Sequence, residues 1–181
     1  KDIPRELSGF ELQAFFTYSR AERAVINARY GIAHKLGLAL HIGFLRLSGC
    51  SLKSIRMVPA VLWAHLGREL GVTPPEVASL KAMYGRGRTL FEHQKLAQEA
   101  LGFHWMTDHQ RRAFVRALRN EVTRLGDKDQ LLAFAQRWLY EHTLLIEHDR
   151  ALRTQIGAAL DLFETETGAA IATTVPLELM G

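Results

Sequence analysis

The stretch "HLGRELGVTPPEVASLKAMYGRGRT", residues 65–89, decides the fold class because it predicts two helices joined by a sharp corner. Gly71 occupies the turn, where a left-handed backbone conformation is needed, and Gly67 leaves room for a close approach. Pro74 and Pro75 fall near the start of the second helix, where an amide hydrogen would have no helical partner in any case. The two prolines therefore predict a corner and not a break in the structure.

The residues after the corner have the spacing of a helix-turn-helix. Val77 and Leu80 recur at helical spacing and predict the buried side of the second helix, which leaves its other face free. Ser79 and Lys81 fall on that free face and are candidate DNA contacts. A purely structural helical hairpin has the same pattern, so both interpretations stay open.

Helix boundaries are marked along the whole chain. A hydroxyl or Asp followed three residues later by Glu or Gln predicts a capped helix start at Ser8/Glu11, Ser19/Glu22, Thr73/Glu76, Thr89/Glu92, Thr107/Gln110 and Asp127/Gln130. Glycines predict helix ends at Gly31, Gly49, Gly71, Gly102 and Gly126. The predicted helices span 9–16, 20–30, 32–48, 59–70, 75–84, 90–101, 108–125, 128–143 and 147–167. Only "SIRMV" and "IATTV" have strand-like composition, so we predict an all-α chain.

Composition sets the class of protein. The chain has 181 residues, 48% of them hydrophobic, and a single cysteine, which excludes an internal disulfide and a thiolate metal cluster. Residues 1–119 carry a formal charge of +9 and residues 120–181 a charge of −5. A basic body favours an anionic partner, although an ordinary solvated surface would give the same counts. The apolar run at 36–47 contains His41 and Arg46 and predicts a buried helix, not a membrane span.

We expect two parts, or one continuous domain. The first part, 1–106, contains the helix-turn-helix at 59–84 and a basic loop and helix at 85–101. The second part, 107–181, is helical and becomes acidic toward its C-terminus. Buried anchors are expected at Trp63, Trp105 and Trp138, and at His41 and His65.

The segment "YGRGRT" predicts an anion-binding loop. Arg86 and Arg88 alternate with glycines, so backbone amides and guanidinium groups can approach a phosphate together. Thr89 then opens a helix whose N-terminus favours negative charge. The polar side chains along that helix are candidate DNA contacts: His93, Gln94 and Lys95. An amide such as Gln94 can read adenine, and Lys95 can contact guanine or phosphate.

The predicted helix 108–125 carries a second group of arginines. Arg112, Arg116 and Arg119 are three or four residues apart and share one face, with Arg111 at its side. A basic helix face is often merely solvated, but this one lies in the most positive region of the chain. Arg112 and Arg116 are therefore candidate clamps on a DNA backbone.

The chain resembles the N-terminal DNA-binding region of the replicative transposases of the Tn-three family. The resemblance runs through "IPRELSGFELQAFFTYSRAERAVINARYG", "KLGLALHIGFLRLSG", "VPAVLWAHLGRELGV" and "GRGRTLFEHQKLAQEALGF". Its most specific piece is Arg86-x-x-Thr89-x-x-Glu92-His93, followed by Leu101-Gly102-Phe103. The resemblance implies a bacterial, cytoplasmic, DNA-associated protein that binds the terminal inverted repeats of a transposon and self-associates through the rest of the transposase, with no membrane partner.

The resemblance also implies that strand transfer belongs to a later DDE domain, beyond Gly181. The residues themselves lead to the same expectation of no catalysis, because the acids between 127 and 149 are better explained as a helix cap and as charged helix faces. No HExxH motif and no phosphate-binding glycine run is present. We predict no cofactor, no metal site and no catalytic residue.

Two other functions stay open. The acidic C-terminal helices would suit a protein–protein interaction or dimerisation module of the transposase. A free-standing nuclease or recombinase would need the acids near 127–149 to bind metal ions.

Overall fold

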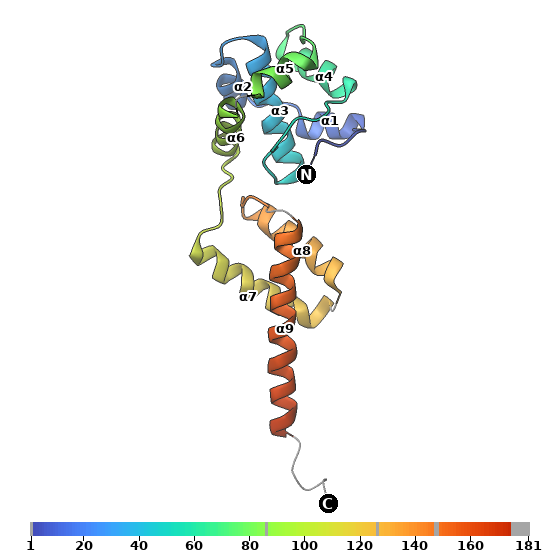
Figure 1. The fold of residues 1–181 in the computed structure, drawn as a ribbon, viewed down its shortest axis with the longest axis vertical. Helices are drawn as coiled ribbons and strands as arrows, with labels where there is room; N and C mark the ends of the chain where they lie inside the picture. Colours follow the sequence, from blue (N-terminus) through green and yellow to red (C-terminus); the bar gives the residue numbers. More distant parts are fainter. Residues whose placement is uncertain (1, 86, 126, 147–148, 175–181) are drawn as a thin grey trace, which may run out of the picture. The chain divides into compact units, whose positions relative to one another are not determined.

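The computed structural model describes residues 2–85, 87–125, 127–146 and 149–174, with side chains described as far as residue 165. In these ranges the chain forms nine helices and no strand (Figure 1). The helices are α1 (Gly9–Phe15), α2 (Arg20–Asn27), α3 (Ile32–Ser48), α4 (Ala60–Leu70), α5 (Val77–Tyr84), α6 (Arg88–Leu101), α7 (Asp108–Leu125), α8 (Lys128–Glu141) and α9 (Asp149–Thr174). The predicted all-α class is confirmed. Residues 54–58 lie in an irregular segment, and residues 171–174 belong to α9.

Most of the predicted helix starts are confirmed by the side-chain caps. The capping boxes at Ser8 and Ser19 form in both directions, and the side chains at Thr107 and Asp127 accept the predicted amide hydrogens. Two predicted caps are wrong. Helix α5 begins at Val77 after Glu76, and α6 begins at Arg88 after Gly87, in both cases without a side-chain cap. Neither Thr73 nor Thr89 therefore occupies a capping position.

The predicted glycine helix ends are confirmed at three positions. Gly49, Gly71 and Gly102 follow α3, α4 and α6 with left-handed φ values of 66°, 65° and 72°. Gly31 also has a positive φ, of 84°, but it precedes α3 and does not close α2, which ends at Asn27. The prediction for Gly126 lies outside the described residues.

The chain divides into two compact units. Unit 1 comprises Lys1–Trp105 and Thr143–Ile146, and unit 2 comprises Met106–His142 and Glu147–Gly181. Unit 1 is built around α3, whose residues Leu36–Leu45 are all buried, as expected for a helix that is apolar on every side. Helices α1, α2, α4, α5 and α6 surround it in Figure 1.

The short segment 143–146 completes unit 1. The amide of His104 donates to the Thr143 carbonyl at 3.1 Å, and the amide of Leu145 donates back to the His104 carbonyl at 2.9 Å. The amide of Ile146 donates to the Gly49 carbonyl at 2.8 Å, next to the end of α3. The chain therefore leaves unit 1 after Trp105, returns at Thr143 and leaves again after Ile146.

Unit 2 is a packing of α7, α8 and α9 against one another. The buried side chains of its core are Phe114, Leu118 and Val122 from α7, Leu131, Ala135 and Leu139 from α8, and Leu152, Ile156 and Ala159 from α9. Each helix contributes residues three or four positions apart, so one stripe of each helix forms the core.

Three of the five residues predicted as buried anchors are buried in the structure, and two are not. Trp63 is buried, and its indole Nε1 donates to the Pro75 carbonyl at 2.7 Å. His41 and His65 are buried as predicted. Trp105 is 58% exposed, so its assignment as a core anchor is wrong. Trp138 is half-buried and stacks on the exposed ring of His142, with centroids 3.8 Å apart.

Candidate nucleic-acid interface

The corner between α4 and α5 has the backbone that the glycines predict. Gly71 has φ 65° and ψ 34°, and the amide of Val72 donates to the Gly67 carbonyl at 2.9 Å. A Cβ atom at Gly67 would lie 2.4 Å from Cγ of Pro74, so only glycine fits there. Both prolines precede α5, which begins at Val77, and the Pro75 carbonyl accepts a hydrogen bond from the Trp63 indole.

Helix α5 turns one side to α3 and the other to solvent. Leu80 and Tyr84 are buried, and a Cβ atom at Gly37 of α3 would lie 2.4 Å from the Tyr84 hydroxyl. Both α4 and α5 pack on α3. Ser79 and Lys81 are exposed on the outer side of α5, where they were predicted to lie.

The basic loop leads directly into α6. Gly87 has φ 71° and precedes Arg88, the first residue of the helix, whose side chain is exposed. Thr89 is half-buried in the first turn. The prediction for Arg86 lies outside the described residues.

His93 does not lie on the surface. Its side chain is 0% exposed, and its Nδ1 atom shares a hydrogen bond of 2.7 Å with the Tyr84 hydroxyl. The rings of His34 and His41 lie 5.7 and 5.9 Å from its ring, centroid to centroid. The prediction of a DNA contact at His93 is therefore wrong for this structure, because α6 uses this neutral polar ring to pack on α3 and α5.

Burial makes this histidine cluster resistant to protonation. Burial, together with the nearby His34, lowers the pKa of His93 to about 4. Burial and the nearby His93 lower the pKa of His41 to about 3. The Nε2 atoms of His41 and His93 are buried and have no hydrogen-bond partner among the described residues, so an imidazolium proton would be left unsatisfied.

Gln94 also faces the protein. Its Nε2 atom donates to the Leu52 carbonyl at 2.8 Å, and one turn later Gln98 donates to the Ser51 hydroxyl at 2.9 Å. These two bonds attach α6 to the segment that follows α3. Gln94 is therefore not placed to read adenine, and this prediction is also corrected.

The outer face of α6 includes Arg88, Phe91 and Lys95, which are three and four residues apart and all exposed. The exposed acids Glu92 and Glu99 lie on the same side of the helix. Lys95 Nζ lies 3.7 Å from the Glu99 carboxylate, an exposed pair of small net value. Arg88 has no ion-pair partner among the described residues.

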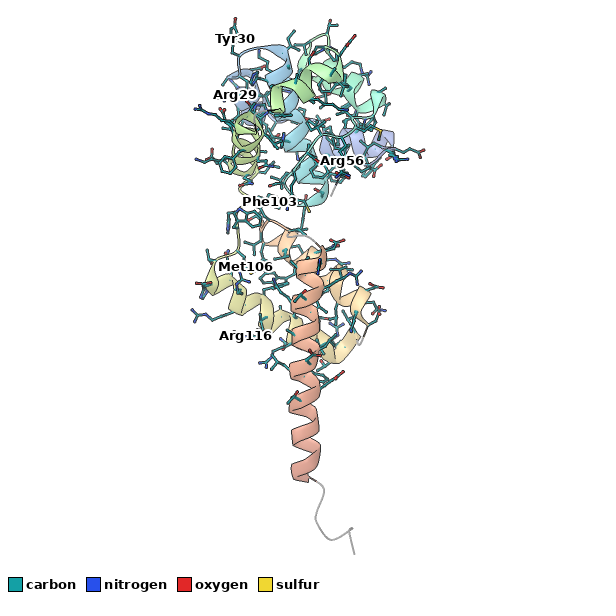
Figure 2. The ribbon with its side chains drawn as sticks, in the orientation of Figure 1. Arg29, Tyr30, Arg56, Phe103, Met106 and Arg116 are labelled. Atoms are coloured by element: carbon teal, nitrogen blue, oxygen red, sulfur yellow. The ribbon has the colours of Figure 1, made fainter. Side chains whose placement is uncertain are left out.

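Helix α7 presents the second basic face, in unit 2. Phe114, Leu118 and Val122 are buried, whereas Arg112 and Arg116 are exposed. Figure 2 shows Arg116 on the outer side of α7. Neither arginine has an acidic partner among the described residues. The candidate contacts are thus divided between Ser79, Lys81, Arg88 and Lys95 in unit 1 and Arg112 and Arg116 in unit 2.

Tyr30 and Phe91 are exposed aromatic residues that were not predicted as site residues. Tyr30, between α2 and α3, is 97% exposed, and Phe91 on α6 is 69% exposed. The only sequence signal for Phe91 is its helical spacing from Arg88 and Lys95. Tyr30 has no such signal, because it lies in a loop whose direction is set by packing.

A family model described as "Domain of unknown function (DUF4158)" matches residues 1–159. The chain belongs to this family.

The chain is also similar to three bacterial transposases. A transposase for insertion sequence element IS1071 in transposon Tn5271, from Comamonas testosteroni, is 59% identical over 175 residues, which are 97% of this chain and 18% of the relative. A transposase for transposon gamma-delta, from Escherichia coli (strain K12), is 30% identical over 148 residues, 78% of this chain and 14% of the relative. A transposase for transposon Tn1546, from Enterococcus faecium, is 24% identical over 153 residues, which are 84% of this chain and 15% of the relative.

The resemblance to Tn-three-family transposases is thereby confirmed. The chain spans less than a fifth of the length of each of these relatives. Among the described residues, no helix is long and apolar enough to span a bilayer. In the same residues, no group of three or more His, Cys, Asp or Glu side chains is arranged to hold a metal ion.

Proposed function

We propose that this chain binds double-stranded DNA at the terminal inverted repeats of a transposon, as one part of a bacterial transposase. Strand transfer itself would then belong to another part of the full-length protein. The observation that carries the proposal is the outer face of α7, where Arg112 and Arg116 are exposed without acidic partners in the described chain. The similarity to transposases supports the same role.

The basic residues would act mainly on the DNA backbone. A guanidinium group makes a bidentate, charge-assisted contact with phosphate, so Arg88, Arg112 and Arg116 are the expected phosphate contacts. Lys81 and Ser79 on α5 would add contacts from the same unit as Arg88. Lys95 is the remaining candidate for a base contact on α6, because its weak pair with Glu99 can be replaced by a base edge.

The proposal is tested by fluorescence anisotropy with the terminal repeat of its own element and a scrambled duplex, at several salt concentrations. Each phosphate contact that is removed should lower the salt slope of binding by about 0.9. We therefore expect Arg88→Ala, Arg112→Ala and Arg116→Ala to weaken binding to both duplexes and to flatten the salt dependence.

Arg124→Ala is the matched control, because Arg124 lies on α7 but already binds the Glu121 carboxylate at 3.0 Å. We expect this variant to bind like the wild type. Equal affinity of the wild type for the two duplexes would contradict sequence-specific recognition. An unchanged salt slope in all three arginine variants would show that these faces do not meet DNA.

A second candidate function is a helical interaction or dimerisation module. It would use α9, in the acidic part of the chain, where Leu162 is 49% exposed. If this function holds, the chain self-associates in sedimentation experiments and Leu162→Glu makes it monomeric. A wild-type chain that is monomeric at all concentrations would exclude dimerisation through this face.

A further inference from the structure

Three exposed apolar side chains of unit 1 come from two neighbouring pieces of chain. Tyr30 (97% exposed) and Ile32 (44%) lie where α2 passes into α3, and Phe91 (69%) lies on α6. Helices α2 and α6 are in contact. An ion pair of 2.5 Å joins Arg29, the residue before Tyr30, to Glu92, the residue after Phe91.

The side chains of Tyr30 and Phe91 both point toward solvent. Figure 2 shows Arg29 beside α6 and Tyr30 extending away from the body of unit 1. Gly31 follows Tyr30 with φ 84°, a conformation that an L side chain rarely adopts, and so permits the turn into α3. The Tyr30 side chain, between the ion-paired Arg29 and this glycine turn, is 97% exposed.

Cations flank these rings. Lys35 and Tyr30 line the same shallow hollow of about 500 Å³, and Arg88 and Lys95 lie on either side of Phe91 along α6. The acidic groups of this surface are Glu92 and Glu99, and both are already paired with cations. The surface formed by Tyr30, Ile32, Lys35, Arg88, Phe91 and Lys95 is therefore apolar and positive, and we call it the aromatic surface.

We propose that Tyr30 and Phe91 insert between bases of the bound DNA, while Lys35 and Arg88 of the aromatic surface hold the adjacent phosphates. This inference rests on the proposed function. Exposed rings between basic residues have the chemistry needed to stack on unpaired or unstacked bases, and apolar side chains wedge into base steps in proteins that bend duplex DNA. The positive charge favours DNA over an apolar protein partner.

The test uses the full 181-residue chain and end duplexes with 2-aminopurine at successive positions. Unstacking of a base raises the fluorescence of 2-aminopurine. We expect the wild type to raise it at one or two positions, and Tyr30→Ala and Phe91→Ala each to remove one of these increases. Each variant should also bind the end duplex roughly 5- to 150-fold more weakly, the range of one base–aromatic stack.

Tyr30→Phe keeps the aromatic ring, so this variant should keep both the increase in 2-aminopurine fluorescence and the affinity for the end duplex. Phe10→Ala is the matched control, because Phe10 is a 79% exposed aromatic residue on α1, which lies on the opposite side of unit 1 from α6 in Figure 1. We expect this variant to bind and to unstack bases like the wild type.

The outcomes separate the inference from the proposed function. Binding of the end duplex with the same affinity and fluorescence by the wild type, Tyr30→Ala and Phe91→Ala would overturn the inference and leave the proposed function standing. Loss of self-association in these variants with unchanged DNA binding would also overturn the inference, because the aromatic surface would then contact a second protein chain and not DNA. A wild type that binds no duplex would refute the proposed function first.

Discussion

Helices α6 and α7 carry similar mixtures of polar and apolar residues but use them in opposite ways. In α6 the polar residues His93 and Gln94 face the interior of unit 1 and form hydrogen bonds there. In α7 the polar residues Arg112 and Arg116 face solvent, and the residues of this helix that are fully buried are apolar. The difference follows from charge, because a neutral imidazole or amide can be satisfied by one or two bonds, whereas a buried guanidinium needs a paired anion.

The interior of α6 also depends on space made by another helix. Gly37 of α3 lets the Tyr84 hydroxyl approach the backbone, and this hydroxyl is the partner of His93. The buried residues of α7, by contrast, are the apolar Phe114, Leu118 and Val122, although the half-buried Arg119 also places its Nε atom out of contact with solvent. Unit 1 is therefore the more sensitive of the two to a change of charge inside its core.

The largest expected effect is that of placing a charge on the inner side of α6. His93→Lys puts an ammonium where the present side chain is 0% exposed and where the nearby Glu92 is already paired with Arg29, so we expect a loss of about 3–5 kcal/mol in the free energy of unfolding. Arg112→Lys on α7 keeps an exposed charge and should change stability by less than about 0.5 kcal/mol. Urea unfolding followed by far-UV circular dichroism measures the stability of both variants. Equal unfolding midpoints for the two would contradict the difference between the buried side of α6 and the exposed side of α7.

A smaller effect is expected from acid. The folded pKa values of His93 and His41, about 4 and about 3, lie below the usual value of 6.5, so the unfolded chain binds more protons below pH 6.5. Their contribution to stability is fully present above pH 6.5 and is lost as the pH falls toward the folded values. Between pH 7 and 5.5 the two histidines together should cost about 2–3 kcal/mol.

The pH dependence can be assigned by substitution. The groups that face His93 are His34, His41, Tyr84 and, through their charges, Arg29 and Glu92. His93→Gln removes one titrating group and should reduce the pH dependence of the urea midpoint by about half. His109→Gln, at an exposed position of α7, should leave the pH dependence as in the wild type. An acid-independent midpoint in the wild type would show that the cluster accepts protons without cost.

Helix positions were predictable because the signals that set them are local. Serine caps at Ser8 and Ser19 and left-handed glycines at Gly49 and Gly71 act within one turn of the chain, and all four predictions were confirmed. The return of residues 143–146 to unit 1 was not predictable in the same way, because its backbone bonds reach residues as distant as Gly49.

The candidate site was predictable only in part. The outward direction of Arg112 and Arg116 follows from the apolar spacing of α7, and the structure places them on its exposed side. The inward direction of His93 does not follow from spacing, because polarity alone does not separate a buried neutral ring from an exposed one. It depends on Tyr84 and on the room left by Gly37, which only the packing of three helices brings together.

The smallest expected effect distinguishes two adjacent residues of α6. Gln94→Ala removes the bond to the Leu52 carbonyl and should lower the free energy of unfolding by about 1 kcal/mol, while DNA affinity stays the same. Lys95→Ala removes an exposed side chain and should change stability by less than about 0.5 kcal/mol, while binding to the end duplex weakens. Urea unfolding and anisotropy on the same two variants give both quantities. A loss of DNA affinity in Gln94→Ala at unchanged stability would show that Gln94 leaves Leu52 to read a base, and the contrast between the inner and outer sides of α6 would no longer hold.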